Sequence, residues 1–123
     1  MNKILIPVSI GELFDKYSIL QIKSEKITDT NKLILINKEL NYLKTIINKF
    51  DLSFLQNIKQ INEKLWIIED EIREKEAKNV FDDEFILLAR LVYKTNDKRS
   101  QLKNKINTLF NSNIIDIKSY SNY

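Results

Sequence analysis

The chain contains almost no turn-forming residues: among 123 residues there is one glycine, Gly11, and one proline, Pro7. A β-sheet protein needs many tight turns, and glycine and proline supply the backbone conformations that most of these turns require. Long helices joined by a few loops need far fewer such residues. The scarcity of glycine and proline therefore favours an all-α fold.

Apolar residues recur at alternating spacings of three and four along four segments of the chain. Two clear examples are the series Leu33, Ile36, Leu40, Leu43, Ile47, Phe50 and the series Phe54, Ile58, Ile61, Leu65, Ile68, Ile72. A repeat near 3.5 residues is typical of helices that pack almost antiparallel in bundles and coiled coils. We predict an all-α antiparallel helical bundle of four helices, at about residues 10–27, 31–50, 53–78 and 83–110.

The predicted helices are flanked by capping residues. Ser9 and Glu12 give the capping-box form S-x-x-E, with Ser9 as the N-cap of the first helix. The caps expected further along are Asp51 or Ser53, Asn79 in the left-handed conformation, and Asp82 or Asp83. Residues 3–8 and 114–120 read as short extended segments that could pair as a two-stranded ribbon. With no linker or repeat, residues 1–123 are expected to form a single domain.

The composition excludes several kinds of chemistry. The chain has no histidine and no cysteine, which removes familiar zinc sites, Ser-His and Cys-His nucleophile pairs, and disulfides. One glycine cannot build a phosphate-binding loop, and no cofactor is predicted. The net charge of +3 comes from lysines interleaved with acids, so nucleic acid is not an expected partner.

The hydropathy pattern bears on location. No stretch reaches the roughly 18 uncharged apolar residues needed to span a bilayer. The N-terminal segment also lacks the small-residue cleavage site of a signal peptide. We therefore expect a cytoplasmic protein with no membrane span.

Three arginines, Arg73, Arg90 and Arg99, stand out in a sequence that otherwise uses lysine. If the last two helices form a hairpin that turns near residues 79–80, Arg90 lies level with Asp70 and Glu69. Arg99 then lies level with Ile61 and Asn62. One interpretation is a buried ion-pair layer, Arg90 with Asp70 and Arg99 with a neighbouring acid, that fixes helix alignment. The other is an anion-binding site in the bundle core. Its candidate residues are Arg73, Arg90, Arg99, Glu69, Asp70 and Asp97.

Glu12 and Asp15 form an E-x-x-D pair on one helical face, and Glu69 and Asp70 add two acids on another helix. Carboxylates from two helices can hold Mg²⁺ against a phosphorylated substrate, as in helical nucleotide pyrophosphatases. The acid-rich partner motif of those enzymes is absent, and surface salt bridges are the simpler interpretation. A grip on a small dicarboxylate, as in helical chorismate mutases, is a further alternative.

Apolar residues outside the helical seams point to an additional contact surface. They are Trp66, Ile67, Ile86, Leu87 and Tyr93. Helices that are apolar nearly all round are wrapped by other helices or by a second subunit. We therefore expect a homodimer.

Four segments together resemble a known family: residues 6–27, KLWIIEDEIREKE at 64–76, FILLARLVYKTNDKRSQLKNKIN at 85–107, and IDIKSY at 115–120. The chain is similar to a bacterial domain-of-unknown-function family of about this size. The matching positions include Glu12, Asp15, Lys16, Trp66, Glu69, Asp70, Arg73, Arg90, Tyr93, Asn96, Asp97, Arg99 and Lys118. The resemblance implies no catalytic residues. It does imply a context beside tetratricopeptide repeats or glycosyltransferases, in surface-polysaccharide assembly.

Two functions follow as hypotheses. The first is a non-catalytic helical module for oligomerisation or partner docking, linked to glycan synthesis through the resemblance. The alternative is a small-molecule binding protein or enzyme that holds an anionic ligand in the bundle core, with Mg²⁺ as a cofactor if it acts like a pyrophosphatase.

Overall fold

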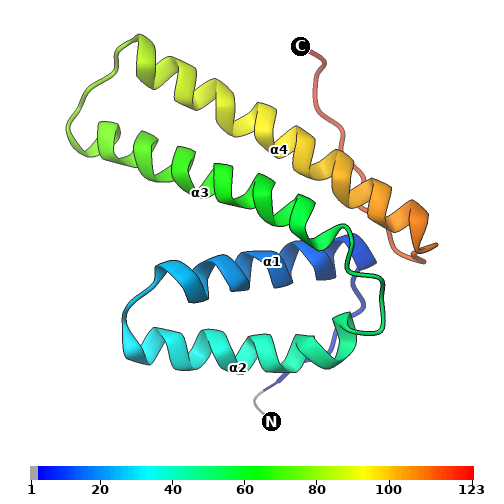
Figure 1. Ribbon diagram of the computed structural model, residues 1–123. Helices are drawn as coiled ribbons and strands as arrows, with labels where there is room; N and C mark the ends of the chain where they lie inside the picture. The colour runs from blue at the N-terminus through cyan, green and yellow to red at the C-terminus, as the bar shows by residue number, and fades with distance from the viewer. Residues whose placement is uncertain (1–2) are drawn as a thin grey trace.

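The computed structural model describes residues 3–123, which form four helices (Figure 1). The helices are α1 (Ile10–Lys26), α2 (Thr30–Ile47), α3 (Leu55–Ala77) and α4 (Asp83–Leu109). The prediction of an all-α helical bundle is confirmed. The largest difference in a boundary is at the end of the second helix, which was expected at residue 50 and ends at Ile47. No described helix is long and apolar enough to cross a membrane.

The helices are arranged as two hairpins, α1 with α2 and α3 with α4. Helix α1 lies between α2 and the α3–α4 hairpin (Figure 1). α1 packs against all three other helices, whereas α2 contacts α1 alone. The bundle is therefore open on the outer side of α2. This arrangement makes α1 the helix through which the two hairpins are joined.

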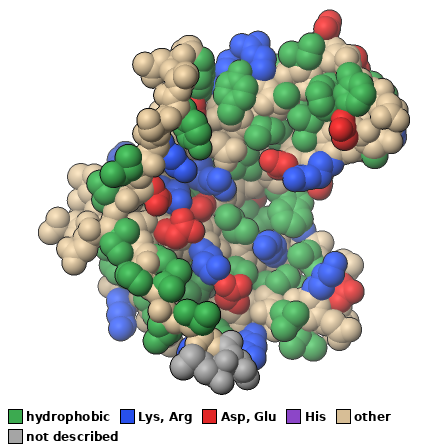
Figure 2. Space-filling view, turned by 180° about the vertical axis from the view of Figure 1, so that it is seen from behind, with side chains coloured by type: hydrophobic (Ala, Val, Ile, Leu, Met, Phe, Trp, Pro, Cys, Tyr) green, Lys and Arg blue, Asp and Glu red, His purple; other side chains and the backbone are tan. Residues whose placement is uncertain are grey.

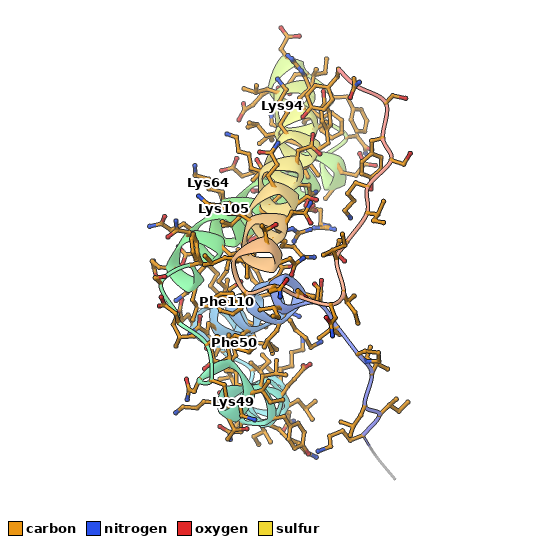
Figure 3. All side chains as sticks on the ribbon, turned by 90° about the vertical axis from the view of Figure 1, so that its right-hand side faces the viewer. Lys49, Phe50, Lys64, Lys94, Lys105 and Phe110 are labelled. Carbon is orange, nitrogen blue, oxygen red and sulfur yellow. The ribbon has the colours of Figure 1, made fainter. Side chains whose placement is uncertain are left out.

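The main apolar core lies at the end of the molecule away from the two hairpin turns. Its buried residues are Leu13, Phe14, Ile47, Ile58 and Ile106. The rings of Phe14, Phe50 and Phe110 pack beside them with centroids 5.4 to 6.2 Å apart. Figure 3 shows Phe50 and Phe110 close together in this region. Because aromatic rings bury large apolar areas, this cluster fixes how the start of α1 meets the end of α4.

Most of the predicted caps are present. Ser9 Oγ accepts a hydrogen bond from the backbone N–H of Glu12 at 3.0 Å, and Asp82 caps α4 in the same way. Asn79 has a φ of 56°, the left-handed conformation expected after α3. The cap predicted for α3 is wrong. Its N-cap is Phe54, which makes no side-chain capping bond, and Asp51 instead accepts from the N–H of Ser53 within the loop.

The predicted ribbon between the two ends of the chain is also wrong, because no strand forms within residues 3–123. The N-terminal arm, residues 3–8, lies beside α2, whereas the C-terminal tail, residues 112–123, runs back along α4 (Figure 1). A two-stranded ribbon is marginally stable without packing support. Each end instead lies beside a different helix.

Candidate functional site

Buried polar side chains gather where α1 faces α3 and α4. Burying a polar group without a hydrogen-bond partner costs several kcal/mol, so such groups are normally paired. Those buried here are Ser9, Asp15, Ser18, Asn62, Thr95 and Asn107. The junction of the two hairpins is therefore the part of the described structure in which buried polar side chains are concentrated.

Asn62 of α3 links the two hairpins through its side-chain amide. Its Nδ2 donates to Asp15 Oδ1 and to Ser18 Oγ, both at 2.8 Å. Its Oδ1 lies 3.4 Å from Arg99 Nη1 on α4, which is a long hydrogen bond. Asn62 therefore contacts α1 on one side and α4 on the other. The level of Arg99 with Asn62 agrees with the hairpin register expected from the sequence.

Lys103 of α4 is the charged centre of the junction. Its Nζ lies 2.6 Å from Glu12 Oε2, 3.0 Å from Asp116 Oδ2 and 3.8 Å from Asp15 Oδ2. Its side chain is 12% exposed. Burial opposes the charged form, but the contacts with the three carboxylates outweigh it and raise the pKa of Lys103 above its ordinary value. The positive charge of Lys103 is thus held by α1 and by the tail.

Gly11 lets α1 and α4 approach closely. Its N–H donates to Asn107 Oδ1 at 2.6 Å. A Cβ atom at this position would lie 2.5 Å from the backbone oxygen of Lys103 and 3.0 Å from Asn107 Oδ1. Real Cβ atoms do not come so close to a backbone oxygen, so only glycine fits this helix crossing.

The C-terminal tail is fastened along α4. Near its start, Ser112 Oγ accepts from the N–H of Ile10 at 3.1 Å. At its end, the hydroxyl of Tyr123 donates to Asp97, and the rings of Tyr93 and Tyr123 meet edge-on with centroids 5.3 Å apart. The bond to the Asp97 carboxylate raises the pKa of Tyr123. Figure 3 shows the tail running beside α4, on the side opposite Lys64 and Lys105.

A groove of about 960 Å³ lies between this tail and α4. Its charged and polar lining includes Asn96, Asp97, Arg99, Ser100, Lys103 and Lys118, and its aromatic lining is Tyr93, Tyr120 and Tyr123. Figure 2 shows basic and acidic side chains together in the middle of this face, beside the tail. A smaller hollow of about 410 Å³ meets the groove at Asn96 and Arg99, and Trp66 lines it on the α3 side.

The structure separates the arginines that were considered together. Arg90 and Asp70 are both exposed, and no ion pair joins them, so the buried ion-pair layer does not form. Arg73 is exposed and pairs with Glu69 one turn before it, at 2.6 Å. Arg99 is half-buried and has no carboxylate within 4 Å among residues 3–123. Of the candidate residues, Arg99 and Asp97 line the groove, and Arg99, Glu69, Asp70 and Arg73 line the hollow.

The E-x-x-D carboxylates, Glu12 and Asp15, both lie at the junction, where Asp15 is buried and Glu12 is partly exposed. The ammonium of Lys103 lies against both of them, so their charges are balanced by a protein cation. Glu69 and Asp70 lie further along α3 and line the hollow instead. Within residues 3–123, no group of three or more acidic side chains is arranged to hold a metal ion.

Sequence reasoning missed Lys103, Asn107 and Asp116. Lysine and asparagine are so frequent in this chain that neither type stands out, and only their contacts with α1 distinguish these two. A signal was nevertheless present. The lone glycine of the chain lies in a predicted helix, where glycine is unfavourable and often marks a close helix approach.

The fold and the junction define a small open four-helix protein in which two hairpins are joined by a buried polar cluster and a groove lies under the C-terminal tail. Residues 4–123 match the model of a family described as "Family of unknown function (DUF6165)". The chain belongs to this family. No curated protein and no solved structure gives a significant match.

Proposed function

We propose that this chain is a non-catalytic helical module that associates with a second copy of itself through its N-terminal arm and the outer face of α2. The observation that carries the proposal is the exposure of the arm. Ile4, Leu5 and Ile6 are 84%, 84% and 70% exposed. Runs of large apolar residues that remain uncovered on a folded chain mark interaction surfaces.

The arm lies beside a second uncovered apolar surface. Because α2 contacts α1 alone, its outer side carries Leu35, Tyr42 and Ile46 at 67%, 45% and 46% exposure. Their spacings of seven and four place them on one stripe of the helix. A groove of about 740 Å³ separates the arm from this stripe, and both contribute apolar side chains to its lining.

A second copy of the chain fits this surface. The arm and the α2 stripe are neighbours on one face, so a two-fold axis across that face would place each arm on the stripe of the other copy. Two-fold interfaces of this self-complementary kind are the commonest in soluble oligomers. Lys38 and Glu39 border the groove, and Glu39 pairs with Lys16 of α1 at 2.9 Å, so this edge of the interface is charged.

The resemblance stated from the sequence supplies the process in which we place the dimer, surface-polysaccharide assembly. In that setting the module would hold two copies of a larger machinery together. The self-association is the part that can be tested on the chain alone.

Sedimentation equilibrium of the purified chain over a wide concentration range tests the proposal. We expect a mass of twice 14.6 kDa at high concentration. The double substitution Leu5→Glu and Leu35→Glu places a carboxylate in each half of the interface. It should weaken association at least about 30-fold, which corresponds to about 2 kcal/mol.

The control is Leu109→Glu, a single change at a 56% exposed apolar residue at the end of α4. It adds the same kind of charge outside the proposed interface, so the dimer should survive it. A wild-type mass of 14.6 kDa at every concentration would refute the proposal. So would a control variant that dissociates as readily as the double variant.

A further inference from the structure

Arg99 carries a positive charge that no carboxylate of the described chain pairs with. It is half-buried at the junction, and its one hydrogen bond within the described part of the chain is the 3.4 Å contact with Asn62. The neighbouring cation, Lys103, contacts three carboxylates, whereas none within residues 3–123 lies within 4 Å of Arg99. A guanidinium offers a planar fork of donors that matches phosphate or carboxylate oxygens. Arg99 lines the groove, so its unused N–H donors are available there to bind phosphate or carboxylate oxygens.

Lys118 adds a second available positive charge. It lies on the tail and lines the same groove, and no ion pair holds it within the described chain. Since Asp116 contacts Lys103 and Tyr123 contacts Asp97, the tail runs antiparallel to α4. This direction places Lys118 nearer the Arg99 end of the groove than the Tyr123 end. The two cations thus share one end.

The opposite end of the groove is aromatic. Tyr93 and Tyr123 meet there, and Asp97 lies beside them as a hydrogen-bond acceptor. Tyrosine rings stack on planar or sugar rings, and a carboxylate accepts from hydroxyl or amino groups. From Tyr93 to Lys103, α4 rises about 15 Å at about 1.5 Å per residue. The groove volume of about 960 Å³ is within the range of small-molecule sites.

We infer that the groove between α4 and the C-terminal tail binds a nucleoside diphosphate, free or as part of a larger conjugate. The phosphates lie against Arg99 and Lys118, and the nucleoside lies against Tyr93 and Tyr123. Asn96 and Ser100 supply neutral polar groups along the wall between the two ends. This site is separate from self-association, because its residues come from α4 and the tail rather than from the arm and α2.

The test is isothermal titration of the full chain with four compounds: uridine diphosphate, adenosine diphosphate, pyrophosphate and uridine. We expect one of the diphosphates to bind with a Kd below about 1 mM and at least about tenfold more tightly than pyrophosphate or uridine. The first comparison shows the contribution of the ring, and the second shows that of the phosphates. The fluorescence of Trp66, the one tryptophan of the chain, gives a second readout because Trp66 and Arg99 line the same hollow.

Arg99→Met should weaken binding of that diphosphate at least about tenfold. The Kd of Arg99→Lys should lie between those of Arg99→Met and the wild type, because lysine keeps the positive charge but lacks the planar fork of donors. The control is Lys98→Met, which removes one charge from an exposed neighbour outside the groove and should change Kd less than about twofold. Circular dichroism checks that each variant is folded, which we expect since Arg99 makes one long hydrogen bond.

Three results would overturn the inference. The first is the absence of binding by both diphosphates at about 1 mM. The second is an equal loss in Arg99→Met and Lys98→Met, which would indicate general charge attraction. The third is binding of pyrophosphate as tight as that of the nucleotides, which would leave the aromatic end without a role.

Discussion

Helices α1 and α2 are nearly equal in length, with 17 and 18 residues, and α2 is the more apolar of the two in sequence. The number of buried residues does not follow this order, because α1 buries more residues than α2. Seven residues of α1 are buried, Asp15 and Ser18 among them, whereas α2 buries Ile36 and Ile47. The difference follows from position, because α1 contacts three helices and α2 contacts one. The three-and-four spacing of apolar residues predicted a helix in both segments, but the neighbours of each helix decided which of its residues are buried.

The same comparison separates the two kinds of surface in this protein. Around α1, several polar side chains are buried and paired, as in the contacts of Asn62 and Lys103. On the outside of α2, apolar side chains are exposed and lack a cover. Buried polar groups specify how elements fit together, and exposed apolar groups provide surface for another molecule. Substitutions on the two helices should differ accordingly.

The largest effect should come from Lys103→Met. The change leaves Asp15, whose side chain is 8% exposed, with its charge balanced by no cation. Breaking a buried ion pair by removing one partner costs about 3–5 kcal/mol. We expect urea unfolding to show a loss of about 4 kcal/mol, whereas Lys94→Met, on the opposite side of α4, should stay within about 0.5 kcal/mol.

Alkaline titration checks the cause of that loss. The pKa of Lys103 is raised in the folded state, so its contribution is complete below the ordinary lysine value of 10.5 and disappears as the pH rises through the folded value. The difference in stability between wild type and Lys103→Met should therefore shrink above pH 10.5. A constant difference across that range would show that the lysine acts by packing alone.

A second effect compares the same substitution on the two helices. Ile22 of α1 is 0% exposed, and Ile34 of α2 is 61% exposed. Ile22→Ala removes buried apolar groups and should lower the free energy of unfolding by about 3 kcal/mol. Ile34→Ala should change it by less than about 0.5 kcal/mol, because little burial is lost and alanine is the better helix former. Equal effects would mean that α2 is covered in solution as fully as α1.

The smallest of the three effects should come from Gly11→Ala. Alanine would gain about 1 kcal/mol of helix propensity. Its Cβ would lie 2.5 Å from the backbone oxygen of Lys103, so α1 and α4 must move apart, at a cost of about 1–3 kcal/mol plus the bond to Asn107. We expect a net loss of about 2 kcal/mol by thermal unfolding. Asn41→Ala, at an exposed position of α2, should instead be neutral or stabilising.

The sequence by itself determined the four helices, most of their caps and the register of the α3–α4 hairpin. These features depend on residues that are close along the chain: the three-and-four apolar spacing, Ser9 before α1, Asn79 after α3 and Asp82 before α4. A short turn also fixes which residues face each other across a hairpin, so Asn62 and Arg99 could be placed at one level. They could be predicted because the governing interactions are local.

The tertiary structure alone decided which helix is central and which polar residues meet. Glu12, Asp15, Lys103 and Asp116 come from three segments far apart in the chain, and their contacts follow from the angle at which one hairpin crosses the other. Of the arginines considered together, Arg99 is half-buried at the junction, whereas Arg90 and Arg73 are exposed. Apolar periodicity records only that a helix has a buried face. It does not record the helix against which that face packs, because apolar packing is non-directional.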